Sequence, residues 1–365
     1  MFFTISLLAQ PGKDGNLTVS TTNVVVNTYT NLSSNAFAGQ TSIQVGSASA
    51  LSPTLGAGDL IMIYQAQGAT IQTTDDKDYG KILDYNGAGN YEYQYVKSVV
   101  GNTIYLNCAL TQKYIVSGRT QVLKVPQYDI LTINSGASIV PLTWNGTIGG
   151  IIAIHAKNRI INNGTIRAAG FGFRGGDKEN LTLGNTTANN AANFIYRSLN
   201  PAEGGEKGES IAGYQTDYDA PGMGGRYGRG APANGGGGGN AHNSAGGGGA
   251  NGDNGKVYSG AGVMDPNPLY YDAWRLDPDF ILNGNTLTNS SGGGRGGYTY
   301  SANVQNPLTL GPSYAQIIDG VTTIPAVANT AWGGDGRKAN GGRGGRPLST
   351  DPEKRIFIGG GGGAG

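Results

Sequence analysis

The sequence has few of the side chains on which metal sites and most enzyme chemistry depend. Its 365 residues include one cysteine and two histidines. The single Cys108 leaves no disulfide framework within the chain, and together with His155 and His242 it makes too small a set for a zinc site. We expect Cys108 to be a small buried strand residue within 103–110 and both histidines to be structural.

Charge and long apolar runs are scarce as well. Charged residues make up 13% of the chain, and 25 basic against 24 acidic residues leave a formal charge of +1. Proteins that bind nucleic acid by neutralising phosphates need a clear excess of Lys and Arg, so nucleic acid is not an expected partner. No stretch approaches the ~20 consecutive apolar residues of a transmembrane helix.

Sequence motifs of the common catalytic sites are also missing. His155 lies in an apolar run and His242 in a glycine tract, where neither is placed to serve as the base of a nucleophilic triad. The glycine tracts lack the Gly-Lys-Ser/Thr ending of a phosphate-binding loop. Paired carboxylates can cleave glycosidic bonds, but the Asp clusters of this chain lie in turn-like sequence, where Asp is common for structural reasons. We therefore expect no enzyme.

Glycine is the residue that the chain has in excess. Of 65 glycines, 17 lie in residues 1–165 and the remaining 48 in residues 166–365. Glycine loses more backbone freedom on folding than any other residue, so such a region either stays flexible or forms a structure that requires glycine. The last tract reaches the final residue, and we expect the sequence to be the start of a longer protein. The longest tracts cover 235–239, 246–249, 292–294 and 359–363.

Residues 17–138 have the pattern of short strands separated by turns. The clearest signal is at 91–106, where Tyr91, Tyr93 and Tyr95 share one face of an alternating strand and Gly-Asn forms a two-residue hairpin turn. No stretch combines a helical period with capping residues. We predict an all-β fold that begins with a small β-barrel or sandwich. Further strands are expected over 17–29, 41–45, 60–64, 121–125 and 129–133.

The pattern changes at residues 139–170. Two short strands at 159–161 and 164–168 flank an Asn-Asn-Gly turn, a texture that is typical of the rungs of a parallel β-helix. In β-helix-like rungs the inward side chains stack on those of the next rung. The alternative is an antiparallel extension of the preceding domain. The expected inward residues are Ile152, Ile154, Ile160 and Ile166.

Residues 171–365 alternate glycine tracts with aromatic insertions. A flexible linker and an ordered polyglycine-helix bundle both fit such a composition, whereas collagen is excluded because strict Gly-X-Y spacing is absent. The Tyr and Trp residues between the tracts favour the bundle, in which backbone N–H and C=O groups would pair between helices. A short helix is expected over 188–199.

Two groups of residues are candidates for ligand binding. Exposed Tyr and Trp bind sugar faces and partner proteins. Tyr270, Tyr271 and Trp274 are therefore a candidate binding surface. The alternative is that these side chains pack against the glycine tracts. Asp75, Asp76 and Asp78 offer clustered oxygen ligands for Ca²⁺. The alternative for these carboxylates is a solvated loop.

The first residues resemble the end of a secretory signal peptide. An apolar stretch leads into Leu-Ala-Gln at 8–10 and a Pro-Gly break at 11–12, although the usual basic region is missing. Residues 1–16 are therefore expected to be a signal-peptide-like segment, or alternatively a retained first strand. We predict that the protein is secreted or located at the cell surface.

Five segments, taken in order, are informative. They are Gly-Asp-Leu-Ile-Met-Ile-Tyr-Gln-Ala-Gln-Gly-Ala at 58–69, Val-Val-Gly-Asn-Thr-Ile-Tyr-Leu at 99–106, Val-Pro-Gln-Tyr at 125–128, Trp-Asn-Gly-Thr-Ile-Gly-Gly at 144–150 and Gly-Phe-Gly-Phe-Arg-Gly-Gly at 170–176. Together they resemble the N-terminal region of large Gly-rich secreted surface adhesins of Bacteroidota. The group includes gliding-motility adhesins that are exported by the type IX system. The resemblance covers about residues 17–180 and supplies no catalytic residue.

The resemblance implies a structural or anchoring region of a long extracellular adhesin that serves gliding motility or surface attachment. Outer-membrane or cell-surface proteins are the expected partners, with an extracellular glycan or self-association as further possibilities. Two alternatives stay open, namely a polysaccharide-binding or polysaccharide-degrading β-helix protein and a phage-type receptor-binding tip. An enzyme would need two carboxylates converging in a groove with aromatic walls, whereas an adhesin needs an exposed docking surface.

Overall fold

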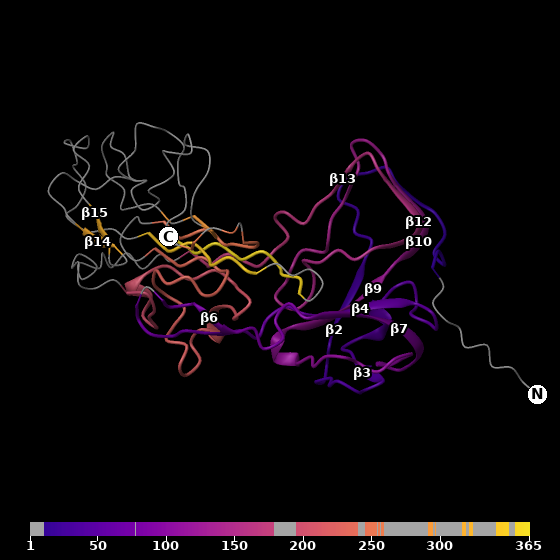
Figure 1. The fold of residues 1–365 in the computed structure, drawn as a ribbon, viewed down its shortest axis with the longest axis horizontal. Coiled ribbons are helices and arrows are strands. Elements are labelled where there is room, and N and C mark those ends of the chain that lie inside the picture. Colours follow the sequence, from indigo (N-terminus) through magenta and orange to yellow (C-terminus); the bar gives the residue numbers. More distant parts are fainter. Residues whose placement is uncertain are drawn as a thin grey trace, which may run out of the picture. The chain divides into compact units, whose positions relative to one another are not determined.

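The structure, a computed structural model, describes most of the chain and divides it into two compact units. The sheet unit comprises residues 1–68, 87–172 and 352–358, and the glycine unit comprises residues 69–86, 173–351 and 359–365. Figure 1 shows the elements of both. The described residues are 11–76, 78–178, 195–239, 245–253, 255, 257–258, 291–294, 296, 316–318, 321–323, 341–349 and 355–365.

The elements of the described residues are strands and single turns of 3₁₀ helix, which confirms the predicted all-β class. No helix among the described residues is long and apolar enough to cross a membrane. The strands of the sheet unit are β1 (Leu17–Val19), β2 (Thr28–Asn31), β3 (Ser42–Gln44), β4 (Leu60–Gln65), β7 (Tyr91–Val100), β8 (Thr103–Leu106), β9 (Thr120–Val125), β10 (Gln127–Ile133), β11 (Ser138–Ile139), β12 (His155–Asn162) and β13 (Thr165–Ile166). Those of the glycine unit are β5 (Thr70–Ile71), β6 (Ile82–Asp84), β14 (Gln316–Ile318) and β15 (Val321–Thr323). The 3₁₀ turns are η1 (Ala48–Ala50), η2 (Val116–Gly118), η4 (Pro201–Glu203) and η5 (Gln215–Asp217).

Six strands of the sheet unit form one antiparallel sheet in the order β2-β9-β4-β7-β8-β3. The sheet curls until its edge strands β2 and β3 meet. Two backbone hydrogen bonds join them there: Ser33 N donates to Gln44 O at 2.9 Å, and Gly46 N donates to Asn31 O at 2.8 Å. The predicted small barrel is therefore confirmed. The barrel interior is apolar and buried, as the alternation along its strands requires. It contains Leu32, Ile43, Val45, Ile61, Ile63, Val96, Ile104, Leu106, Tyr114 and Val122.

The predicted hairpin is the antiparallel pair β7–β8, in which Val100 lies opposite Thr103. Gly101 in the turn has φ +57°, a left-handed conformation that glycine adopts without steric cost. The prediction for Cys108 is wrong, because this residue lies beyond the end of β8 and is exposed. The hairpin partner of β7 ends at Leu106, so Cys108 has no inward face of a strand to occupy.

Parallel strands stack beside the barrel as three short rungs. β1, β10 and β12 form one parallel sheet, and β11 pairs with β13 in parallel while Val24 bridges to Ile139. The chain therefore starts the first rung at residues 17–26, makes the barrel, and returns to add the second rung at 127–139. The β-helix-like rungs predicted for 139–170 exist, but the stack begins at β1, so the predicted boundary at residue 138 cuts through it.

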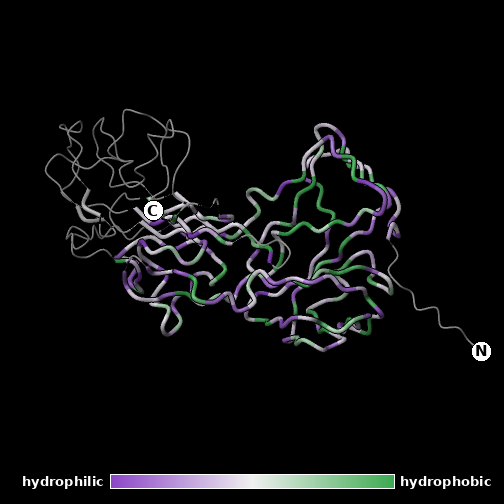
Figure 2. The backbone as a smooth tube through the Cα atoms, in the orientation of Figure 1, coloured by the Kyte–Doolittle hydropathy of each residue, from purple (hydrophilic) through white to green (hydrophobic). Residues whose placement is uncertain are grey.

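Two members of the predicted inward set are exposed. Ile152 and Ile154 pack against the buried core of the rungs, as expected, whereas Ile160 is 47% exposed and Ile166 is 39% exposed. The register explains the difference, since Ile160 lies beside Leu131 and Ile166 beside Ile139, which are both 0% exposed. Their rung is the last one that the described residues supply, and no further described rung covers it. Figure 2 shows the apolar residues of the rungs and the barrel in green, against paler glycine segments.

The glycine tracts of the glycine unit are hydrogen-bonded to one another through their backbones. Gly236 N donates to Gly361 O, and Gly247 N donates to Gly237 O, each at 2.8 Å, while Gly363 N donates to Gly247 O at 2.8 Å. Segments far apart in the sequence thus lie side by side, as the orange and yellow traces of Figure 1 show. A flexible linker is excluded for the described tracts, whereas the polyglycine-helix geometry itself stays a prediction. Residues 195–199 of the predicted helix are not helical, and residues 188–194 lie outside the described residues.

The backbones approach too closely for most other residues to replace these glycines. A Cβ atom on Gly361 would lie 1.7 Å from Arg174 O, and one on Gly237 would lie 2.0 Å from Arg229 O. The neighbouring Gly362 differs, because a Cβ atom there would be 3.5 Å from Gly247 O, an ordinary contact. Adjacent glycines of one tract therefore have different steric requirements.

The pair Gly361→Ala and Gly362→Ala tests the packing of the tracts in the full chain. Gly361→Ala should destabilise the glycine unit by about 1–3 kcal/mol, because the backbone carbonyl that the methyl group meets must move. Gly362→Ala should be neutral or stabilising by about 0.4–1 kcal/mol, since alanine restricts the unfolded chain. Amide hydrogen exchange in the glycine tracts measures both effects, and equal exchange rates in the two variants would contradict the packing described.

Candidate functional site

The structure places only part of the ligand-binding residues that the sequence suggests. Tyr270, Tyr271 and Trp274 lie outside the described residues. Their role in binding stays a prediction.

The acidic cluster at 75–78 has structural partners. Asp75 Oδ1 accepts hydrogen bonds from the backbone N–H groups of Tyr196 at 2.8 Å and Arg197 at 3.1 Å, and Asp76 Oδ1 accepts one from Asp78 N at 2.8 Å. Within the part of the chain that the structure describes, no group of three or more His, Cys, Asp or Glu residues is placed to hold a metal ion. A calcium site at Asp75, Asp76 and Asp78 remains a prediction that these contacts do not support.

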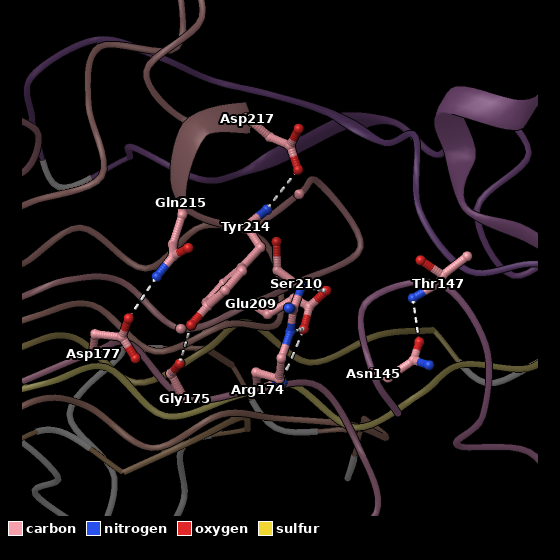
Figure 3. Close-up of polar contacts among 12 residues, drawn as sticks. Asn145, Thr147, Arg174, Gly175, Asp177, Glu209, Ser210, Tyr214, Gln215 and Asp217 are labelled. Carbon is pink, nitrogen blue, oxygen red and sulfur yellow. Dashed lines mark hydrogen bonds and ion pairs between the residues drawn. The ribbon is translucent and has the colours of Figure 1, made fainter. Parts of the chain in front are cut away.

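A network of charged and aromatic side chains fastens the glycine tracts (Figure 3). Arg174 donates to Glu209 through Nε at 2.8 Å and Nη2 at 3.1 Å, and the Glu209 side chain is 1% exposed. The hydrogen bond to Glu209 raises the pKa of Arg174. The Tyr214 ring centroid lies 4.2 Å from the same guanidinium, and its hydroxyl donates to Gly175 O at 2.9 Å. This group holds Tyr214 against residues 174–175 and connects them to Glu209.

The neighbouring carboxylates are all engaged by donors. Gln215 Nε2 donates to Asp177 Oδ2 at 2.8 Å and to Glu206 Oε2 at 3.2 Å, and Arg226 pairs with Glu206 and Asp219. These shared donors connect the segments that hold Asp177, Glu206 and Asp219.

A surface pocket of about 330 Å³ lies on the glycine unit, within the size range of small-molecule sites. It combines two tyrosines with basic, acidic and hydroxyl side chains. The lining residues are Lys81, Ile82, Leu83, Tyr85, Asp253, Tyr258, Arg346, Pro347 and Ser349.

The back of the pocket is held in place by hydrogen bonds to the backbone of the tracts. The Tyr258 hydroxyl donates to Gly344 O at 2.5 Å, and Arg346 Nη2 donates to Tyr79 O at 3.0 Å. The Arg346 guanidinium lies 4.6 Å from the centroid of the Tyr258 ring, a distance at which a cation is attracted to an aromatic face. These side chains are oriented before any ligand arrives.

The acidic wall of the pocket is oriented in the same way. Asp253 Oδ1 accepts hydrogen bonds from Gly255 N and from Ser291 Oγ, both at 2.8 Å. The bond from Gly255, together with that from Ser291, lowers the pKa of Asp253. The side chain is therefore a stable hydrogen-bond acceptor for a ligand hydroxyl.

The rim of the pocket is exposed. Leu83 of β6 is 64% exposed, and Lys81 is exposed beside it. Among the described residues, no carboxylate is paired with the Lys81 ammonium. Lys81 and Arg346 outnumber Asp253, so the charged groups of the pocket favour an anionic ligand.

Sequence reasoning missed this pocket because its residues come from three segments, at 81–85, 253–258 and 346–349. Tyr258 and Arg346 lie in glycine-rich sequence, where an isolated aromatic or basic residue was the available signal. The fold of the tracts, which brings the segments together, has no local sequence signature.

Lys207 is a buried cation of the glycine unit that has no counter-ion within ion-pair distance among the described residues. It is 0% exposed, donates to the carbonyl oxygens of Gly225 and Tyr227, and lies 5.1 Å from the Tyr79 ring centroid. Burial lowers the pKa of Lys207 well below its ordinary value, against the opposing attraction of the carboxylates at 75 and 219.

Comparisons with known proteins give no family. No protein-family model matches the chain, and no curated protein matches it. The tailspike Gp54 of Acinetobacter baumannii bacteriophage AP22, solved in complex with A. baumannii capsular saccharide, is 22% identical over 42% of this chain and 23% of its own, with a TM-score of 0.21. The tailspike gp61 of Pseudomonas phage phi297 is 15% identical over 46% of this chain and 27% of its own, also with a TM-score of 0.21.

A third tailspike, gp49 of Pseudomonas phage LKA1, is 15% identical over 37% of this chain and 28% of its own, with a TM-score of 0.19. The chain thus spans about a quarter of the length of each of these structures. At these TM-scores the likeness supports no inference about function.

The pH dependence of stability tests the burial of Lys207. Because the pKa of Lys207 is lower in the folded than in the unfolded chain, the unfolded chain binds more protons between the two values, and stability rises with pH up to about 10.4. The wild type should therefore gain stability relative to Lys207→Met as the pH is raised through this window. Buried tyrosines with raised pKa values are present in both proteins, so their contribution to the pH dependence cancels in the difference between the wild type and Lys207→Met.

Urea unfolding of the full chain at a series of pH values measures this difference. Lys178→Met, at an exposed lysine of the same unit, is the matched control and should keep a constant offset from the wild type. A constant offset for Lys207→Met as well would show that the Lys207 pKa is not lowered by folding.

Proposed function

We propose that this chain is a saccharide-binding module of an extracellular attachment protein, and that the pocket of the glycine unit is its binding site. The observation that supports the proposal is the composition of the pocket. Two tyrosines, two cations and one carboxylate surround a volume of about 330 Å³, and the groups at its back are fixed by the hydrogen-bonded glycine tracts.

A sugar suits this arrangement for chemical reasons. The apolar C–H faces of a sugar ring pack on tyrosine rings, and its hydroxyl groups need donors and acceptors at fixed positions. Asp253 supplies an acceptor and Arg346 supplies donors, and both are already tied to neighbouring groups. Preorganisation of this kind reduces the entropy lost on binding.

The excess of positive charge in the pocket favours acidic sugars as ligands. Lys81 and Arg346 face a single carboxylate in the pocket, so a sugar that carries a carboxylate should bind more tightly than a neutral one. The surface polysaccharides of bacteria are a class in which such sugars occur. This proposal follows the polysaccharide-binding and receptor-binding alternatives of the sequence analysis, whereas a role in gliding motility stays a prediction.

Within this proposal the glycine tracts are the rigid support of the site. Their backbones are paired in the described residues, and so they can hold the pocket walls without a large apolar core. Extracellular location and attachment to a cell surface belong to the proposal as well. No catalytic step is part of the proposal.

Affinity electrophoresis with alginate, an acidic polysaccharide, and dextran, a neutral one, tests the proposal. Alginate should retard the full chain more strongly than dextran. Tyr85→Ala should weaken alginate binding about tenfold, whereas Tyr85→Phe should retain most of it because the ring is preserved. Lys81→Ala should weaken binding of alginate but not of dextran.

The control for charge is Lys178→Ala, which removes an exposed lysine outside the pocket. The same loss in this variant as in Lys81→Ala would mean that alginate responds to overall charge rather than to the pocket. Retardation that survives both Tyr85→Ala and Lys81→Ala would overturn the assignment of the site.

A further inference from the structure

The outer face of the barrel is covered over one half and open over the other. On β4 and β9 its side chains are buried, as Met62 and Leu123 show at 0% exposure. Residues 140–153 run over this half, where the Tyr29 hydroxyl donates to Ile151 O at 2.6 Å and Gln121 Nε2 donates to Gly149 O at 2.9 Å. The same face continues onto β7, β8 and β3.

Tyrosines occupy the open half. Tyr93 lies opposite Met62 in the register of β7 and β4, so it belongs to the outer face. Tyr105 on β8 lies opposite Ser98 on β7, and the buried Leu106 beside it points to the barrel interior. Tyr93 is 47% exposed and Tyr105 is 40% exposed. Large aromatic side chains are thus exposed on the outside of the barrel, although the opposite face of the same strands is a packed core.

The tyrosines form a row. The ring centroids of Tyr91 and Tyr93 are 5.9 Å apart and meet edge to face, and Tyr95 follows on the same side of β7. Asn107 N donates to Tyr95 O at 2.9 Å, which makes Tyr105, two residues before, a diagonal neighbour at about 7–8 Å. The row extends beyond the reach of a single sugar ring.

The surroundings of the row are mostly polar, with one cation at each end. Gln44 Nε2 donates to Thr103 Oγ1 at 2.8 Å at the edge of this face. Glu92 points away from it, because its carboxylate accepts hydrogen bonds from Thr111. Lys97 lies in the bulge of the β7–β8 pair beyond Tyr95. At the other end of the row, the backbone of Arg355 bridges to Asn90, the residue before Tyr91. Between these two cations, the outward-facing residues of β7 and β8 carry no charge.

We propose that the tyrosine face, defined as Tyr91, Tyr93, Tyr95 and Tyr105, binds a neutral glycan chain. Tyrosine rings supply apolar surface for the C–H faces of successive sugars, and the phenol, hydroxyl and amide groups supply hydrogen bonds. The uncharged surface between Lys97 and Arg355 matches an uncharged occupant and sets this face apart from the pocket with Lys81 and Arg346. The face belongs to the sheet unit, so it does not rest on the function proposed for the pocket.

Affinity electrophoresis of the full chain with hydroxyethylcellulose and galactomannan, both neutral, and with alginate tests the proposal. At least one neutral polymer should retard the wild type, and Tyr93→Ala and Tyr105→Ala should each weaken that retardation about tenfold, as expected for aromatic anchors. Tyr93→Phe should keep most of it. Alginate binding should not change in these variants.

Two controls separate the outcomes. Val116→Ala removes an exposed apolar side chain of the sheet unit away from the row and should leave retardation by the neutral polymers unchanged. Tyr85→Ala should weaken alginate binding without changing retardation by the neutral polymers. No retardation by either neutral polymer, or retardation that persists in Tyr93→Ala and Tyr105→Ala, would overturn the proposal. A concentration-dependent dimer in light scattering that disappears in Tyr93→Ala would also overturn it, by assigning the face to a second copy of the chain.

Discussion

The glycine unit depends on backbone hydrogen bonds between segments that approach so closely that a Cβ atom would collide with the neighbouring carbonyl. At Gly361 that atom would lie 1.7 Å from Arg174 O, which makes glycine a steric requirement rather than a source of flexibility. The glycines order at a high cost in backbone entropy. Hydrogen bonds alone contribute modestly to net stability, and so the tracts need further interactions to stay together.

The sheet unit, by contrast, depends on side chains, since the burial of apolar residues decides its fold. Alternation and turn chemistry predicted β4, β7, β8 and β9 from local sequence, including the Gly101 turn. What could not be predicted was the return of the chain after the barrel, because pairing of Leu17 with Leu131 is a contact between residues far apart in sequence. Local patterns likewise could not show that no further described rung covers the rung of Ile160. For this reason Ile160, which was expected to point inward, is exposed.

The candidate sites also differ in how much of each could be predicted from local sequence. Tyr91, Tyr93 and Tyr95 could be placed on one face from their spacing, and the structure adds that this face is uncovered, a fact that depends on where residues 140–153 run. The pocket of the glycine unit joins three distant segments and left no local signal beyond Tyr258 and Arg346 in glycine-rich sequence. The acidic cluster that the sequence did single out is engaged by backbone N–H groups, which is the usual role of Asp in turns.

The abundance of tyrosine follows from what glycine cannot provide. A glycine tract has no side chain to bury, so its neighbours must supply contact area and hold the charged residues that enter the packing. Arginines do this in pairs with tyrosines: Arg174 lies 4.2 Å from the Tyr214 ring, Arg229 lies 5.4 Å from Tyr196, and Arg346 lies 4.6 Å from Tyr258. Each such pair places a cation over an aromatic face, an attractive arrangement that is strongest where water is excluded, as at Arg229, which is 0% exposed. The same Tyr258–Arg346 pair forms the back of the pocket, so the contact that stabilises the tracts also presents an aromatic and a cationic group to a ligand.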